Sequence, residues 1–216
     1  RDVALKDRTE WKVIGKPIPR ADTRMKVNGS AKFGIDVRLP GMLFAVVERS
    51  PRFVGKVKSF DASKALAVPG VKHVVKTERD IFGNMREGVA VVATSTWAAI
   101  KGRRALVVEW DETGIPDMSS ASIAAQNKAA LTGKPLSFKH KGDVAAALGT
   151  TPAVDVTYET PYQAHACMEP INCTAHVTDS SAEIWGPMQA PDWNRGHLAA
   201  ALKLPMEKVK VNMTFL

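Results

Sequence analysis

Cysteine and aromatic residues are scarce in this sequence. Its 216 residues include two cysteines, Cys167 and Cys173, and aromatic side chains make up 6% of the chain. Two cysteines cannot supply the disulfide framework that replaces a core in small secreted domains. If the stretch between them is extended, the two thiols lie about 20 Å apart, beyond disulfide reach. We therefore expect two buried, unreactive thiols and few stacking surfaces for nucleic-acid bases.

Long apolar runs and phosphate-binding loops are also absent. Charged residues interrupt almost every apolar run, so none approaches the roughly 18–20 residues of a membrane-spanning helix. Neither Gly-x-x-x-x-Gly-Lys nor Gly-x-Gly-x-x-Gly occurs, which argues against the common nucleotide-dependent enzymes. The sequence starts at Arg1 without a methionine or a leader, which predicts a processed protein or an excised piece of a longer one.

Positive charge is in excess. Thirty lysines and arginines face 22 aspartates and glutamates, which gives a net charge of +8. Such an excess favours anionic partners, but the basic residues are spread over several short clusters and form no long run. We interpret them as a solvated basic surface and expect no nucleic-acid partner. A non-enzymatic module that binds a partner through its basic face and a sheet edge remains an alternative.

The pattern of the first half predicts one α+β domain. An extended arm, residues 1–26, precedes it and carries a short strand at 11–14. The domain itself, residues 27–115, alternates short β-branched runs with two helices, the first capped by Asp61 and the second by Ser95 or Thr96. Strands are expected at 33–37, 42–47, 71–76, 88–93 and 107–110, and helices at 62–67 and 97–105.

The second half begins with a helical linker, residues 116–152, whose two helices follow Ser119 and Asp143 as N-caps. Residues 153–216 then form a strand-rich domain. Strands are expected at 153–159, 164–169, 172–177, 183–185 and 209–213, with one helix at 191–204. A domain that stops one strand after a helix is expected to be incomplete, and its unpaired edges predict that the chain alone self-associates or has mobile termini.

One short stretch concentrates groups that bind metals. In an extended strand, His165, Cys167 and Glu169 would share one face, and His176 could join them from a paired strand. Imidazole, thiolate and carboxylate all bind zinc or iron, so a small metalloenzyme is a further alternative. A cysteine nucleophile activated by either histidine is another. Because no paired ligand spacing occurs in the sequence, we favour hydrogen-bonded structural groups.

The stretch Gly186-Pro187-Met188-Gln189-Ala190-Pro191-Asp192 lies between an expected strand and an expected helix. Backbone amides and the side chain of Gln189 can meet an anion or an oxo group at such a place. Composition and spacing by themselves favour a plain turn followed by a helix that starts at a proline.

Two ordered sets of motifs run through the chain. The first set comprises Val27-Asn28-Gly29-Ser30-Ala31-Lys32-Phe33, Leu39-Pro40-Gly41-Met42-Leu43, Arg49-Ser50-Pro51, Asp61-Ala62-Ser63-Lys64-Ala65 and Val68-Pro69-Gly70-Val71. The second set comprises Pro161-Tyr162, His165, Met168-Glu169-Pro170, Trp185-Gly186-Pro187-Met188-Gln189-Ala190-Pro191 and Lys208-Val209-Lys210-Val211. Together they resemble the xanthine dehydrogenase and aldehyde oxidase family of molybdenum hydroxylases, above all the large, or beta, subunits of the isoquinoline 1-oxidoreductase type.

The resemblance implies an α+β fold in which an α/β hammerhead domain is followed by an incomplete, strand-rich part of a molybdopterin-binding domain. It implies an oxidoreductase that hydroxylates an N-heterocyclic aromatic compound or oxidises an aldehyde with water-derived oxygen. The implied cofactor is molybdopterin in its cytosine dinucleotide form, and the implied partner is a small [2Fe-2S] subunit that takes the electrons. Export to the periplasm is usual in such relatives and is implied for the full-length protein.

The resemblance also assigns roles to residues. Gln189 matches the family glutamine whose amide donates a hydrogen bond to the oxo group on molybdenum, and His165 with Met168-Glu169-Pro170 matches a recurring stretch that we interpret as scaffold. The glycine-rich loop Gly-Gly-Gly-Phe-Gly is expected just beyond Leu216, and the glutamate base farther downstream. We therefore assign no catalytic residue in this chain, and we expect it to bind no cofactor and to be inactive without the remainder of the large subunit.

Overall fold

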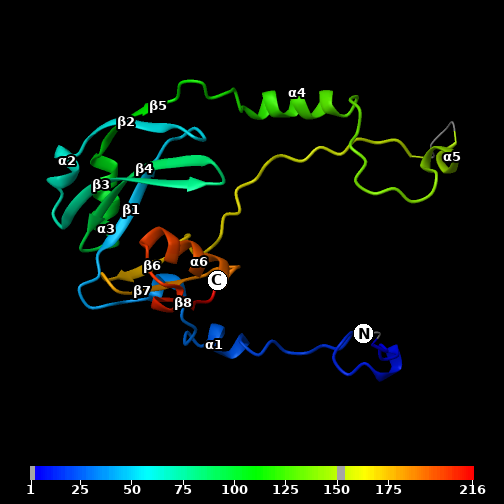
Figure 1. The fold of residues 1–216 in the computed structure, drawn as a ribbon, viewed down its shortest axis with the longest axis horizontal. Helices are drawn as coiled ribbons and strands as arrows, with labels where there is room; N and C mark the ends of the chain where they lie inside the picture. Colours follow the sequence, from blue (N-terminus) through cyan, green and yellow to red (C-terminus); the bar gives the residue numbers. More distant parts are fainter. Residues whose placement is uncertain (1–2, 150–153) are drawn as a thin grey trace. The chain divides into compact units, whose positions relative to one another are not determined.

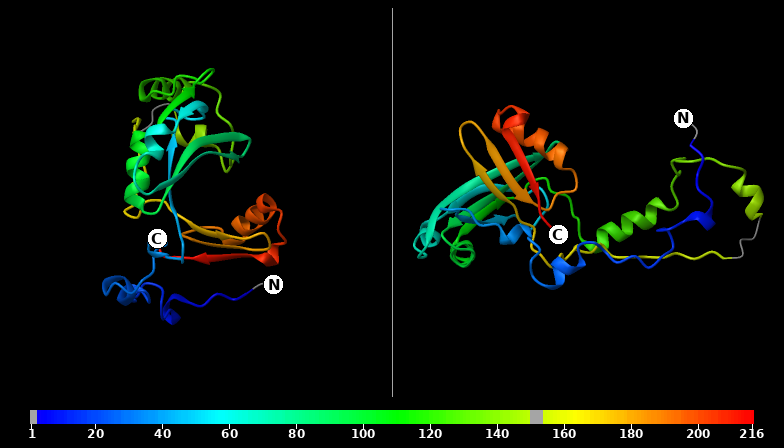
Figure 2. Two further views of the ribbon diagram at one scale, coloured as in Figure 1. Left: turned by 90° about the vertical axis from the view of Figure 1, so that its left-hand side faces the viewer. Right: turned by 90° about the horizontal axis from the view of Figure 1, so that it is seen from below.

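The computed structural model describes residues 3–149 and 154–216. The chain forms two compact units, one built from Arg1–Leu39 with His165–Leu216 and the other from Pro40–Ala164. Helices and strands alternate in both units (Figures 1 and 2), which confirms the mixed helix and strand content expected from the sequence. Within the described residues, no helix combines the length and the apolar character needed to cross a membrane.

A three-stranded antiparallel sheet forms the centre of the Pro40–Ala164 unit. Its strands are β1 (Phe44–Arg49), β3 (Val71–Ile81) and β4 (Asn84–Ala93), in the order β1–β4–β3. The middle strand β4 is buried over residues 89–91, as expected for an apolar, β-branched run between two neighbours. Helix α3 (Thr96–Ala105) packs against this sheet (Figure 1).

Two residues of the sequence determine where helix α3 begins and how closely it packs. The Ser95 hydroxyl accepts a hydrogen bond from the Ala98 backbone N–H at 3.2 Å and so caps the helix. Gly102 brings the helix backbone close to the sheet. A methyl group at Gly102 would lie 2.8 Å from a methyl carbon of Val71 and 2.8 Å from one of Val91. The expected helix at 97–105 is thus confirmed, together with its cap.

A second, two-stranded sheet is joined to the first through the Glu87 carboxylate. Strands β2 (Lys56–Asp61) and β5 (Val107–Asp111) pair antiparallel. The Oε2 atom of Glu87, on β4, accepts hydrogen bonds from the Lys76 ammonium at 2.9 Å and from the Val57 backbone N–H at 2.8 Å. The bonds from Lys76 and Val57 lower the pKa of Glu87. One carboxylate therefore connects strands of both sheets.

The lowered pKa of Glu87 predicts that acid weakens this connection. An ionised carboxylate contributes fully above its unfolded pKa of about 4.3, and the contribution is lost as the pH falls through the lower folded pKa. Replacement Glu87→Gln is expected to lower the free energy of unfolding by about 1 kcal/mol at pH 7 and to flatten its decline in acid. Urea denaturation at pH 7 and at pH 3.5 measures both effects. The exposed Glu159, outside both sheets, provides the control Glu159→Gln, and equal stability of the two variants at pH 7 would contradict the prediction.

The other helices of this unit are short or exposed. They are α2 (Ser63–Leu66), α4 (Ser120–Ala130) and α5 (Val144–Leu148). The Ser119 hydroxyl caps α4 by accepting from the Ser122 N–H at 3.2 Å, and the Asp143 carboxylate caps α5 by accepting from the Ala146 N–H at 3.0 Å. Neither α4 nor α5 buries a residue. The residues at which α4 and α5 begin are therefore determined by their local caps and not by packing in a core.

The unit built from both parts of the chain contains a three-stranded sheet with one long helix. Strand β6 (Thr174–Val177) pairs antiparallel with β7 (Ala182–Gly186), and β7 pairs parallel with β8 (Val209–Met213). Helix α6 (Pro191–Leu202) connects the two parallel strands. The core of this unit is a cluster of small and branched side chains: Ala182, Leu198, Ala199, Leu202, Leu204 and Val209.

The N-terminal part of the chain joins this sheet beyond β8. Helix α1 (Thr23–Val27) is followed by a 3-10 turn at Gly34–Asp36. Just before the turn, Phe33 forms a parallel bridge with Phe215, and the Phe215 N–H donates to the Lys32 carbonyl at 3.2 Å. Residues far apart in the sequence thus lie side by side within one unit.

Several expected elements are not formed as predicted. No strand occurs at 11–14 or 164–169, none occurs at 154–159, and 33–37 forms the 3-10 turn instead; Ala153, the first residue of the strand expected at 153–159, lies outside the described residues. Strand-forming side chains need a partner strand to pack beside. Tyr158 and Tyr162 have none, because their side chains are 88% and 84% exposed.

The end of one element and the presence of two others also differ from expectation. Helix α6 ends at Leu202, two residues early, because Lys203 adopts a left-handed conformation with φ of 56°. Strand β2 and helix α1 were not expected. Their sequences are largely polar and carry no clear apolar period, so only their tertiary contacts reveal them.

Candidate functional site

The segment 187–190, here called the Gln189 turn, leads from the end of β7 to the start of α6. Gln189 is exposed and lies at a bend. Within residues 3–149 and 154–216 the structure gives its side-chain amide no hydrogen-bond partner. Ala190, the N-cap of α6, supplies no side-chain cap, and Pro191 at the first helical position has no backbone N–H to donate. The free donor of the turn is therefore the side-chain amide of Gln189.

Backbone hydrogen bonds fix both ends of the Gln189 turn. The carbonyl of Gly186 accepts from the Thr214 N–H at 3.3 Å. The carbonyl of Ala190 accepts from the Asn194 N–H at 3.0 Å and from the Asn194 side-chain amide at 2.9 Å. The turn is thus anchored to β8 on one side and to α6 on the other, while the side chain of Gln189 stays available.

The four residues of the alternative metal site do not come together. In the part of the chain that the structure describes, no group of three or more histidine, cysteine, aspartate or glutamate side chains is placed to hold a metal ion. His165 and Cys167 lie outside any strand, and Ala166 between them has a φ of 47°, which breaks the alternation that a shared face requires. His176 lies on β6. The metalloenzyme hypothesis built on these side chains is wrong.

The two cysteines differ from expectation as well. Both are unpaired and exposed, not buried. Partial desolvation raises the pKa of the Cys173 thiol, which keeps it protonated near neutral pH and makes it a weak nucleophile. No hydrogen bond joins either cysteine to a histidine among the described residues. The structure therefore provides no activated cysteine.

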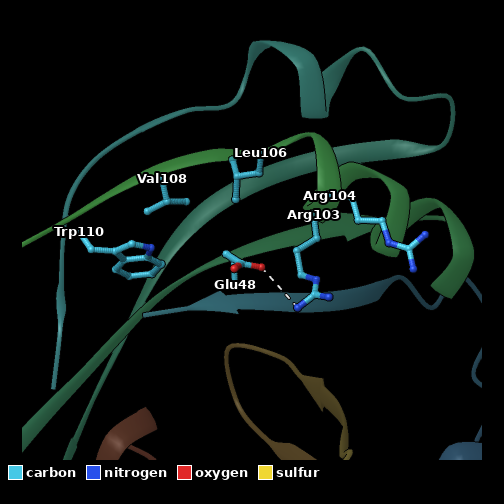
Figure 3. Close-up of a pocket in the computed structure, with 6 residues that line it drawn as sticks. All are labelled: Glu48, Arg103, Arg104, Leu106, Val108 and Trp110. Atoms are coloured by element: carbon cyan, nitrogen blue, oxygen red, sulfur yellow. Dashed lines mark ion pairs between the residues drawn. The ribbon is translucent and has the colours of Figure 1, made fainter. Parts of the chain in front are cut away.

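One hollow of about 300 Å³ lies in the Pro40–Ala164 unit and contains none of the predicted site residues. Figure 3 shows its lining, which consists of Glu48, Arg103, Arg104, Leu106, Val108 and Trp110. Alternate residues along β5 supply an apolar wall. An ion pair with an N–O distance of 3.4 Å joins Arg103 to Glu48, and the Arg104 guanidinium lies 5.8 Å from the ring centroid of Trp97. The Nε atom of Arg103 is buried and has no hydrogen-bond partner among the described residues, but none of the predicted site residues lines the hollow, and we assign no chemistry to it.

Comparison with known proteins identifies the fold around the Gln189 turn. Residues 125–216 match the model of the molybdopterin cofactor-binding domain. The chain is 30% identical over 226 residues to isoquinoline 1-oxidoreductase subunit beta of Brevundimonas diminuta, an alignment that covers 98% of this chain and 27% of that protein. It is 26% identical over 224 residues to the aldehyde oxidoreductase molybdenum-binding subunit PaoC of Escherichia coli O157:H7, with 94% of this chain and 30% of that protein covered.

A solved structure shows the same fold over nearly the whole chain. Quinoline 2-oxidoreductase from Pseudomonas putida 86 matches with a TM-score of 0.65 at 20% identity, covering 99% of this chain and 31% of that one. The chain thus shares its fold with that structure. The match to the molybdopterin cofactor-binding domain and the similar subunits support the assignment of this chain as a fragment of the molybdenum hydroxylase family. It spans 27–30% of the length of the two relatives named above.

The residues of the Gln189 turn fit the cofactor of that family. An oxo group needs a hydrogen-bond donor that has no competing acceptor nearby, and the amide of Gln189 meets this condition. An amide is neutral at every physiological pH, so it stabilises negative charge on oxygen without titrating. The turn also lies inside the matched region 125–216. Sequence patterns alone favoured a plain turn here, and only the family resemblance singled out Gln189.

Proposed function

We propose that this chain is part of the molybdenum-binding subunit of a hydroxylase that acts on an N-heterocyclic aromatic compound or on an aldehyde, using water-derived oxygen. The relatives support both substrate classes, since one is an isoquinoline oxidoreductase and another an aldehyde oxidoreductase. The observation that carries the proposal is the unpartnered Gln189 amide, held on an anchored turn within the matched domain.

Gln189 would contact the cofactor directly. When bound, the molybdenum cofactor supplies the transferred oxygen and accepts two electrons from the substrate. The Gln189 amide would donate a hydrogen bond to an oxygen of that group and stabilise the charge that develops there. The fixed ends of the turn limit the motion of the backbone that carries this donor.

Further features of the complete protein are part of the proposal. We assign residues 27–115 to an α/β hammerhead domain, 116–152 to a linker and 153–216 to the start of the molybdopterin-binding domain. The cofactor would be the cytosine dinucleotide form, and a small [2Fe-2S] subunit would receive the electrons. The glycine-rich loop and the glutamate base would come from the remainder of the large subunit. Family resemblance supports a periplasmic location.

Elemental analysis by mass spectrometry tests this proposal. Two proteins would be purified from a host that synthesises molybdopterin: this chain alone, and the full-length large subunit produced together with its small subunit. We expect near-stoichiometric molybdenum in the full-length protein only, because most of the cofactor site would lie outside this chain. A host without molybdopterin synthesis is the control. A full-length complex that contains no molybdenum would rule the proposed function out.

A further inference from the structure

The Glu169 carboxylate connects two segments that are distant in the sequence. Its Oε1 atom accepts a hydrogen bond from the Ile35 backbone N–H at 2.8 Å and another from the Asn172 side-chain amide at 2.9 Å. The same Asn172 amide donates to the Pro170 carbonyl at 2.8 Å. One oxygen therefore holds the N-terminal 3-10 turn against the loop that precedes β6.

The Asn172 side chain extends this connection to the Gln189 turn. A methyl group at Gly34 would lie 2.5 Å from Asn172 Oδ1 and 3.2 Å from Cδ of Pro187. Gly34, Asn172 and Pro187 therefore meet with no room for another carbon atom. On the strand side, a methyl group at Gly186 would lie 3.4 Å from the Asn172 carbonyl oxygen. At the start of the turn, Gly186 thus lies close to Asn172 and Pro187 lies close to Gly34.

The burial of the second carboxylate oxygen of Glu169 calls for an explanation. Oε2 is buried and has no hydrogen-bond partner among the described residues. An unsatisfied buried oxygen lowers stability, and such groups in native structures call for a reason other than stability. A constraint on the position of neighbouring groups is such a reason.

We propose that Glu169 and Asn172 are positioning residues that hold the Gln189 turn against the N-terminal 3-10 turn and so set the direction of the Gln189 amide. The effect of these two residues on catalysis rests on the proposed function, whereas the mechanical connection between the two turns does not. Glu169 acts on Asn172 through a hydrogen bond, and the Asn172 side chain acts on the turn through its close approach to Gly34, which lies against Pro187 of the turn. Neither residue needs to touch the cofactor.

Hydrogen exchange on the full-length subunit tests the mechanical part without any need for molybdenum. The informative amides are those of Thr214 and Asn194, which bond to the two ends of the turn. In Glu169→Ala and in Asn172→Ala, we expect both amides to exchange several-fold faster than in the wild type. Glu183→Gln is the matched control, because Glu183 is a partly exposed carboxylate of the same sheet whose partners, Lys210 and Asn212, lie on β8. Wild-type exchange in both alanine variants would overturn the proposal.

Steady-state kinetics on the molybdenum-loaded complex tests the catalytic part. A small misplacement of a catalytic donor can lower the rate up to about 100-fold, so we expect kcat of Glu169→Ala to fall about 10- to 100-fold with KM and molybdenum content nearly unchanged. The same substitution in a Gln189→Ala background is expected to lower kcat less than twofold further. A full additional loss in that background would show that Glu169 does not act through Gln189. If Glu169→Ala fails to fold, Asn172→Ala provides the same comparison, because it removes the side chain through which Glu169 acts.

A molybdenum-free wild type would refute the proposed function and, with it, the catalytic part. The exchange data on that protein would still decide the mechanical part. The two failures are therefore distinguishable.

Discussion

Alanine in place of Gln189 is expected to lower kcat of the proposed hydroxylase about 100-fold, the usual effect of removing one preorganised donor to a developing oxyanion. The structure leaves the amide without another partner, so its loss disturbs no hydrogen bond within the described chain. Molybdenum content and the free energy of unfolding are therefore expected to stay near the wild-type values. Glutamate at this position is expected to be at least as damaging, because a carboxylate accepts hydrogen bonds and adds negative charge.

Steady-state kinetics and elemental analysis on the full-length complex measure these effects. A loss that appears in kcat while KM stays constant indicates an interaction made mainly in the transition state. Gln126→Ala is the matched control, because Gln126 is exposed on α4, a helix that buries no residue. Activity of Gln189→Ala within twofold of the wild type would remove Gln189 from the proposed site.

The same substitution, glycine to alanine, is expected to have opposite effects in two helices. Gly102 on α3 leaves no space for a methyl group, since Val71 and Val91 would lie 2.8 Å away, whereas a methyl group at Gly196 on α6 meets nothing within 4 Å. Overpacking a core costs up to about 3 kcal/mol and alanine returns about 1 kcal/mol of helix propensity. We expect Gly102→Ala to lower the free energy of unfolding by about 2 kcal/mol and Gly196→Ala to raise it by about 0.5–1 kcal/mol.

Chemical denaturation of the two variants and of the wild type shows whether each substitution raises or lowers the free energy of unfolding. The valines are the reason for a large effect at Gly102, because a β-branched side chain cannot easily turn its methyl groups away and Val91 is fully buried. Each variant is the control for the other, since the chemical change is identical. Stabilisation by both substitutions would mean that α3 can move away from its sheet at little cost.

Elements with local causes were predictable from the sequence. Ser95, Ser119 and Asp143 each begin a helix as expected, because a capping side chain and the amides it satisfies are close neighbours in the chain. The strands expected around Tyr158 and Tyr162 are not formed, because strand formation depends on a partner that the local sequence does not specify. Strand β2 shows the converse, since pairing with β5 makes a strand of a polar segment.

The residues of the candidate site also differ in how far the sequence could predict them. Gln189 was identified by family resemblance, and its role stays a prediction; the structure places its exposed side chain on an anchored turn. The interpretation of Glu169 as scaffold is consistent with its hydrogen bonds, but its link to Ile35 could not be predicted, because the two residues are 134 positions apart. The only local signal was a carboxylate followed three residues later by Asn172. The alternation of His165, Cys167 and Glu169 was misleading, since the left-handed Ala166 interrupts it.

The bridge between Phe33 and Phe215 has a consequence for biosynthesis. The unit that contains it takes residues from both sides of Pro40–Ala164, so its early segment has no partner until the later one leaves the ribosome. At about 5–20 residues per second, translation of the intervening stretch takes on the order of ten seconds. The Pro40–Ala164 unit can fold during that interval, whereas Phe33 and its neighbours remain accessible to chaperones. Slow or paused translation between these segments is therefore expected to lower the yield of soluble protein more than a pause inside either segment.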